Sequence, residues 1–155
     1  MPGRSHGPQK GPSRIMSASW CCLPLRWIYG RHFPRRFVRA IQTIAIIGAG
    51  NMGSGIAQKS AQERFEVQMV DREQKWVDRG HEIIAGFLDE AVERRIFRPA
   101  DVEAIKGRIS GTVGTESVEP DTDLVIEAVF EDFAIKQEVF ATLDEVCSEH
   151  TILAT

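Results

Sequence analysis

The sequence has few cysteines and no long hydrophobic run. Only three of its 155 residues are cysteine, namely Cys21, Cys22 and Cys147. Their spacing suits neither a metal site nor a set of disulfides, so we expect no bound metal and a reducing compartment. No apolar run approaches the about 20 residues that cross a bilayer, and we therefore expect no membrane partner.

Acidic residues are missing from the first forty positions, which hold eight Lys or Arg and five of the seven prolines. We expect residues 1–40 to form a disordered basic extension, because no apolar pattern persists there. A mitochondrial transit peptide, a start codon placed too early and a linker from an upstream domain would each give such a segment. Pro24 and Pro34 interrupt its helical amphipathicity, which favours an unstructured or non-native extension. The expected location is cytoplasmic, or the mitochondrial matrix if the extension is a transit peptide.

The remaining residues carry the acidic charge and the signs of a folded domain. Residues 41–155 contain 11 basic and 22 acidic residues, so we expect no nucleic-acid partner. Their length suits one domain, with no internal repeat. Strand-like and helix-like segments alternate along them, which predicts an α/β fold with a doubly wound parallel sheet and helices on both faces.

The expected elements follow from hydrophobic periodicity and from Gly and Pro positions. Strands are expected at residues 43–47, 66–70, 108–112, 123–129 and 151–154, and helices at 51–62, 72–97, 99–107 and 133–148. In the first helix, Met52, Ile56 and Ala57 are expected to face the sheet and Gly55 to ease close packing. A doubly wound dinucleotide fold has six strands. We therefore expect an incomplete domain, cut off after about five strands, over residues 41–155.

A glycine-rich motif joins the first strand to the first helix. Gly48 permits the tight turn, Gly50 lets a pyrophosphate approach the backbone, and Gly53 permits close packing of helix on strand. The pyrophosphate would face the helix N-terminus, where free N–H groups favour negative charge. The expected loop residues are Gly48, Ala49, Gly50, Asn51, Met52 and Gly53.

An acid ends the second expected strand. Asp71 lies eighteen residues after Gly53, a spacing that suits hydrogen bonds to the adenosine ribose and predicts NAD rather than NADP. Two alternatives stay open: the loop is a turn without a ligand, or Asp71 is only a helix N-cap. The neighbouring Arg72 is the one residue that could favour the 2′-phosphate of NADP.

These segments resemble one enzyme family, the NAD-dependent 3-hydroxyacyl-CoA dehydrogenases, including the 3-hydroxybutyryl-CoA type. The matching blocks are residues 46–58, 70–71, 123–132, 143–147 and 151–155, and the resemblance covers 41–155. It implies that Glu131 and Lys136 contact the nicotinamide side of the cofactor and that Ala128 contributes backbone contact. Without the resemblance, Glu131 would be read as a helix cap and Lys136 as a solvated residue.

The resemblance also implies a reaction, the oxidation of a (3S)-3-hydroxyacyl-CoA to the 3-oxoacyl-CoA in fatty-acid metabolism. The family's catalytic Ser, His and Asn would follow residue 155, so we expect no catalytic residue in this chain and no turnover by it alone. The full-length parent would take an acyl-CoA substrate and form a homodimer. The alternatives are a related hydroxy-acid dehydrogenase, a multifunctional β-oxidation subunit, and a non-catalytic NAD-binding module.

Overall fold

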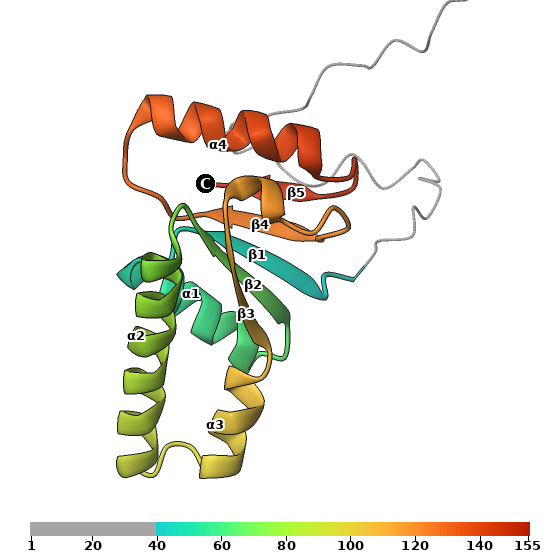
Figure 1. Cartoon of the computed structure of the whole chain (residues 1–155). Coiled ribbons are helices and arrows are strands. Elements are labelled where there is room, and N and C mark those ends of the chain that lie inside the picture. Colours follow the sequence, from blue (N-terminus) through green and yellow to red (C-terminus); the bar gives the residue numbers. More distant parts are fainter. Residues whose placement is uncertain (1–39) are drawn as a thin grey trace, which may run out of the picture. The chain divides into compact units, whose positions relative to one another are not determined.

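The computed structural model describes residues 40–155, which form a five-stranded parallel sheet in the order β3-β2-β1-β4-β5 (Figure 1). The predicted extension 1–40 lies outside the described residues except for its last position. The strands are β1 (Thr43–Ile47), β2 (Glu66–Asp71), β3 (Ile109–Val113), β4 (Leu124–Glu127) and β5 (Ile152–Ala154). The helices are α1 (Asn51–Gln62), α2 (Gln74–Glu93), α3 (Pro99–Lys106) and α4 (Phe133–Val146), with a short 3-10 helix, η1 (Thr115–Ser117).

Helices cover both faces of the sheet. In Figure 1, α4 lies on one side and α1, α2 and α3 lie on the other. Strand β1 serves both layers, because successive side chains of a strand point to opposite faces. Ile44 and Ile46 belong to the core under α1–α3, whereas Ala45 and Ile47 belong to the core under α4. The predicted α/β class, with a parallel sheet and helices on both faces, is confirmed.

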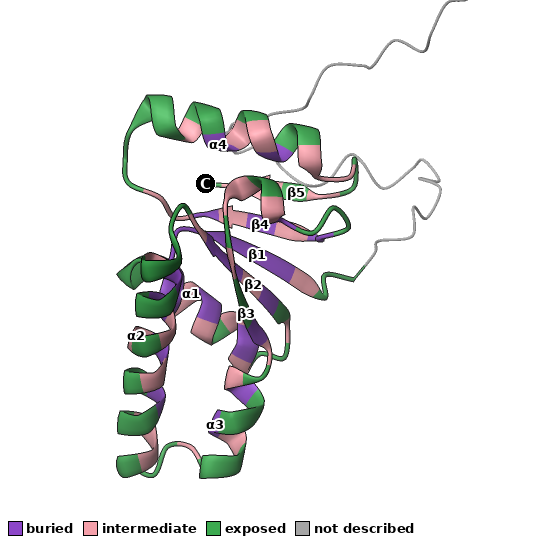
Figure 2. Ribbon diagram, in the orientation of Figure 1, coloured by how far each residue is buried: buried purple, intermediate pink, exposed green. Residues whose placement is uncertain are grey.

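The two hydrophobic cores hold the layers together. Leu88 of α2 anchors the first core and Leu143 of α4 anchors the second, and both side chains are fully buried. Burying a side chain of this size stabilises the fold by about 1.5–3 kcal/mol relative to leaving it in water. Figure 2 shows the pattern, with buried residues concentrated on the central strands and on the sheet-facing sides of the helices.

The predicted packing of α1 is partly wrong. Ala57 is fully buried, but the side chain of Met52 is 75% exposed. Gly53 is a residue of the first turn that meets the sheet, and the preceding position is rotated by about 100° around the helix axis, which turns Met52 to solvent. A Cβ on Gly55 would meet nothing within 4 Å, so Gly55 does not serve close packing.

Most predicted element bounds agree with the structure to within two residues, and α2 is the exception. A helix was expected over residues 72–97, but α2 ends at Glu93. Arg95 adopts a left-handed conformation with φ of 60°, and the N–H of Ile96 bonds back to the carbonyl of Ala91 at 2.8 Å. This turn ends the helix in the way that a C-terminal glycine usually does.

Candidate functional site

The expected site residues gather at the carboxyl ends of β1, β2 and β4. Strand β1 lies between the other two, with Ile47 paired to Val70 on one side and to Glu127 on the other. Helix α1 leaves β1 toward one face of the sheet and α4 leaves β4 toward the other. Open α/β sheets bind ligands at such a switch point, outside the carboxyl ends of the strands.

Gly48 is required by its conformation and by its neighbours. Its φ is +109°, a region that side chains rarely adopt, and its N–H donates to the carbonyl of Val70 at 2.7 Å. A Cβ at this position would lie 2.6 Å from the carbonyl oxygen of Ala128. The start of the glycine loop is therefore packed directly against the residue that follows β4.

The other two glycines of the motif play different roles. A Cβ on Gly53 would lie 1.7 Å from the carbonyl oxygen of Gly48, so only glycine lets α1 approach the loop. Gly50 is exposed, and a Cβ there would meet nothing within 4 Å. The space over Gly50 is therefore open, as the predicted approach of a pyrophosphate to the backbone requires.

The N-terminus of α1 suits an anion. Its N-cap is Gly50, no side chain within the described residues caps it, and its first turn contains no acid. The N–H groups of this turn and the helix dipole together favour a negatively charged group. Ala49 and the first-turn residues Asn51 and Met52 lie where the sequence predicted them, between Gly48 and Gly53.

Asp71 anchors the glycine loop as well as ending β2. Its Oδ2 accepts the N–H of Ala49 at 2.8 Å, and its Oδ1 accepts the N–H of Arg72 at 2.7 Å. The alternative that Asp71 caps a helix is wrong, because the N-cap of α2 is Glu73. Each carboxylate oxygen has a second lone pair. The half-buried Asp71 can therefore accept ribose hydroxyls while it holds the loop.

A network of charged side chains occupies the end of β4. The carboxylate of Glu127 accepts the N–H of Val129 at 2.7 Å and the hydroxyl of Thr155 at 2.6 Å. The ammonium of Lys136 lies 3.1 Å from Glu127 Oε2 and 2.9 Å from Glu131 Oε2. The side chain of Glu127 is 2% exposed, whereas that of Glu131 is 88% exposed. We call Glu127, Glu131, Lys136 and Thr155 the β4-end network.

The β4-end network keeps both of its central groups charged. Burial alone would raise the pKa of Glu127, but hydrogen bonds from Thr155, Lys136 and Val129 outweigh burial and lower it. Hydrogen bonds to Glu131 and then to Glu127 raise the pKa of Lys136 above its usual range. The site therefore presents a cation at the end of β4 throughout the neutral pH range.

The alternative that Glu131 caps α4 is wrong, whereas Lys136 is partly exposed and paired with two carboxylates. The cap of α4 is Asp132, whose Oδ1 accepts the N–H groups of Ala134 at 2.9 Å and Ile135 at 3.1 Å. Lys136 is 22% exposed and is held between two carboxylates. Glu127 and Thr155 were not predicted as site residues. The signal for Glu127 was present, since it is the one charged residue of β4.

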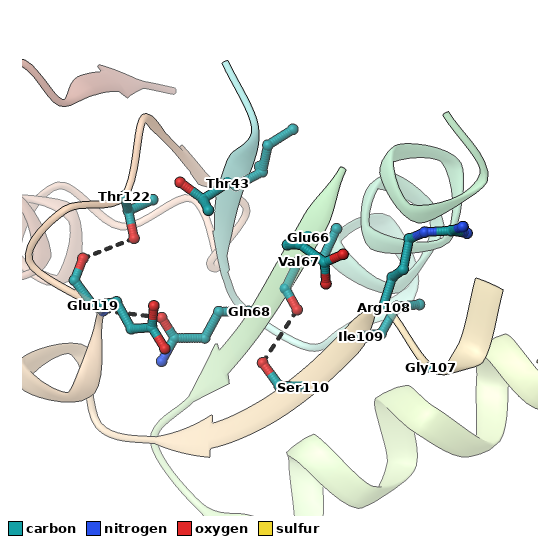
Figure 3. A pocket seen from close by; sticks show the side chains of 11 residues that line it. Thr43, Glu66, Val67, Gln68, Gly107, Arg108, Ile109, Ser110, Glu119 and Thr122 are labelled. Carbon is teal, nitrogen blue, oxygen red and sulfur yellow. Dashed lines mark hydrogen bonds between the residues drawn. The ribbon is translucent and has the colours of Figure 1, made fainter. Parts of the chain in front are cut away.

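A separate hollow of about 210 Å³ lies at the opposite edge of the sheet, at the amino ends of β1, β2 and β3. Figure 3 shows its polar groups bonded to one another: Ser110 donates to the carbonyl of Val67, Thr122 donates to that of Glu119, and the N–H of Glu119 donates to Gln68. This hollow lies at the opposite end of the strands from the predicted site residues.

Comparison with known proteins identifies the family of this chain and agrees with its fold. The sequence model of a protein family, described as the NAD binding domain of 3-hydroxyacyl-CoA dehydrogenase, matches residues 43–155. The chain belongs to this family. The glycine loop, the cap-free N-terminus of α1 and Asp71 fit the NAD that this family domain binds. NAD is therefore confirmed as the cofactor of this family domain.

Individual members of the 3-hydroxyacyl-CoA dehydrogenase family are similar to this chain in sequence and in structure. A probable 3-hydroxybutyryl-CoA dehydrogenase from Bacillus subtilis is 39% identical over 115 residues, which are 74% of this chain and 40% of that protein. A peroxisomal bifunctional enzyme from Danio rerio is 36% identical over 76% of this chain and 16% of its own length. The crystal structure of (S)-3-hydroxybutyryl-CoA dehydrogenase from Ralstonia eutropha superimposes with a TM-score of 0.71 at 33% identity, over 74% of this chain and 41% of that one. The chain thus spans about two fifths of the Bacillus subtilis and Ralstonia eutropha proteins.

Two histidines of the family domain lie away from the cofactor edge. A Cβ on Gly111, in the middle of β3, would lie 2.7 Å from Nε2 of His81. His150 is exposed and precedes β5 at the amino edge of the sheet. Within residues 40–155, no cluster of metal-ligating side chains occurs and no helix has the length and apolarity to cross a membrane.

Proposed function

We propose that this domain binds NAD across β1, with the adenosine half over β2 and the nicotinamide half over β4. Asp71 accepts the adenosine ribose hydroxyls, and the open backbone around Gly50 meets the pyrophosphate. Glu131, Lys136 and the backbone of Ala128 contact the nicotinamide side. The observation that carries the proposal is the cap-free N-terminus of α1, with an acid on one side of it and the Lys136 cation on the other.

The proposed reaction is the oxidation of a (3S)-3-hydroxyacyl-CoA to the 3-oxoacyl-CoA. When bound, NAD supplies the hydride acceptor. This domain orients the cofactor, and a histidine outside residues 40–155 takes the hydroxyl proton, because His81 and His150 lie away from the carboxyl edge. As part of the same proposal, the full-length parent acts on an acyl-CoA substrate and forms a homodimer. The proposal also divides the chain into a basic extension over residues 1–40 and an NAD-binding domain over residues 41–155. A multifunctional β-oxidation subunit is the second candidate, since a peroxisomal bifunctional enzyme is among the relatives. The cytoplasmic or mitochondrial location stays a prediction.

The test of cofactor binding is a fluorescence titration with NADH and NADPH on the wild-type chain and on Asp71→Asn. We expect saturable NADH binding and at least tenfold weaker NADPH binding, because the Asp71 carboxylate repels a 2′-phosphate. Hydrogen bonds to a charged acceptor contribute about 1.5–3 kcal/mol. Asp71→Asn should therefore weaken NADH binding about 10- to 100-fold. It should also bring the affinities for NADH and NADPH closer together.

The matched control is Asp78→Asn, which makes the same change on an exposed residue of α2 whose carboxylate accepts a hydrogen bond from Gln74. It should leave both affinities unchanged. Circular dichroism of every variant separates loss of binding from loss of folding. A folded wild-type chain that binds neither dinucleotide, or binds NADPH as tightly as NADH, would refute the proposal.

A further inference from the structure

The buried carboxylate of Glu127 has no role in the cofactor contacts described above. It lies at the last position of β4, with 2% of its side chain exposed. Its oxygens accept hydrogen bonds from the Val129 N–H, the Thr155 hydroxyl and the Lys136 ammonium. A ligand at the carboxyl edge cannot reach it directly, so any effect on the cofactor passes through a neighbour.

That neighbour is Lys136, whose three acceptors differ in exposure. Its ammonium bonds to the buried Glu127, to Glu131 at 2.9 Å and to the Thr155 hydroxyl at 3.3 Å. Glu131 is 88% exposed, so its carboxylate is free to turn toward a ribose without leaving a cavity. Glu127 is held in place, because its other bonds join it to Val129, just after β4, and to Thr155, just after β5. Of the two carboxylates that pair with Lys136, Glu127 is therefore fixed and Glu131 is exchangeable.

We propose that Glu127 is a positioning residue, which holds the Lys136 ammonium at the carboxyl edge while Glu131 and Lys136 engage the nicotinamide half of NAD. The inference rests on the proposed placement of the two cofactor halves. Its chemistry is electrostatic, since a buried anion at 3.1 Å fixes a cation far better than an exposed one that water screens.

The variant that tests it is Glu127→Gln, which preserves size and removes the charge. The amide oxygen still accepts the Val129 N–H, but the amide NH₂ then faces the Lys136 ammonium, which can only donate, and the Thr155 hydroxyl, which loses the acceptor of its own hydrogen bond. Lys136 loses its fixed acceptor and moves toward Glu131. We expect NADH to bind at least tenfold more weakly, as measured by isothermal titration calorimetry.

The readout that separates positioning from a general structural effect is the affinity for ADP. ADP carries only the adenosine and pyrophosphate part of the cofactor, which lies over β2 and α1. Glu127→Gln should change the ADP affinity by less than twofold. Glu138→Gln, the same change on an exposed residue of α4, should leave both affinities unchanged.

A double-mutant cycle tests the route through Lys136. If Glu127 acts only through it, Glu127→Gln should cause no further loss of NADH affinity when Lys136→Met is already present. The double variant, Glu127→Gln with Lys136→Met, has the same net charge as the wild type. If Glu127→Gln alone fails to fold, the NADH affinities of Lys136→Met and of this double variant still show whether Glu127 acts through Lys136.

Three results would overturn the inference: NADH affinity unchanged in Glu127→Gln, equal losses for NADH and ADP, or additive losses in the double variant. Failure of the wild-type chain to bind NADH would instead refute the proposed function. The two failures are thus distinguishable in one set of titrations.

Discussion

Gly53 gives the sharpest test of how the glycine loop is built. A Cβ on Gly53 would lie 1.7 Å from the carbonyl oxygen and 2.9 Å from the carbonyl carbon of Gly48. Both atoms belong to the backbone, so no side-chain rotation relieves the contact. We therefore expect Gly53→Ala to force α1 away from the loop.

The magnitude follows from the overlap. Carbon and oxygen atoms approach to about 3.3 Å in favourable contacts, so the loop or the helix must move by about 1.5 Å. Overpacking a well-packed site costs about 1–3 kcal/mol, and occasionally more. With backbone on both sides we expect a net loss of about 3 kcal/mol in the free energy of unfolding, even after the better helix propensity of Ala. That is a large part of the about 5–15 kcal/mol that holds an ordinary domain folded.

The matched control lies two residues further along the same helix. A Cβ on Gly55 would meet nothing within 4 Å. Gly55→Ala should therefore stabilise the chain by about 0.5–1 kcal/mol, because Ala restricts the unfolded chain and favours helix. Urea unfolding followed by circular dichroism should separate the two variants by more than 1 M in midpoint, given an m-value of about 1–3 kcal/mol/M. A Gly53→Ala midpoint equal to that of the wild type would refute this account of the loop, as would a loss in Gly55→Ala of equal size.

Two further predictions concern carboxylates. The Oδ2 of Asp123 accepts the N–H groups of Gln42 and Thr43 and the Thr43 hydroxyl, so Asp123→Ala strands donors at the start of β1. We expect Asp123→Ala to lower the free energy of unfolding by about 2–3 kcal/mol, as measured by urea unfolding. The control is Asp144→Ala, at an exposed residue of α4, which should change that free energy by less than about 0.5 kcal/mol. The pKa of Glu127 is lowered from its ordinary 4.5 in the folded chain, so its contribution to stability is present above that value and is lost as pH falls through the lower folded pKa. Glu127→Gln should therefore lose less stability than the wild type between pH 6 and pH 3; parallel curves would contradict this.

The sequence predicted the regions where local signals agree. Residues 43–47 and 51–62 were placed without error, because an apolar run, a glycine turn and a helix pattern follow one another there. The end of α2 was missed for a definite reason. Arg95 takes the left-handed conformation that a sequence pattern assigns to Gly or Asn, and nothing local marks an arginine for it.

The candidate site shows the same division between local and long-range information. The roles of Gly48 and Gly53 follow from their spacing, and the structure adds the partner atoms. The bond from the Ala49 N–H to Asp71 joins residues 22 apart, and the bond from Thr155 to Glu127 joins residues 28 apart. Both depend on which strands become neighbours, which is a property of the sheet order rather than of either segment. The sequence therefore identified Asp71 by its spacing but missed Glu127.

The acids Asp71 and Glu127 show why fold stability alone does not explain the charged side chains at the carboxyl edge of the sheet. Asp71 and Glu127 end the two strands that flank β1, and each accepts a backbone N–H there. Asp71 is only half-buried, whereas Glu127 is buried, and the cost of its desolvation is outweighed only by the combined bonds from Thr155, Lys136 and Val129. Replacing such a buried pair with apolar residues of similar size is often neutral or stabilising, so an apolar pair could join β4 to α4 at lower cost. The proposed role of Glu127, which is to hold the Lys136 ammonium in place for the cofactor, gives a reason for a charged pair at this position.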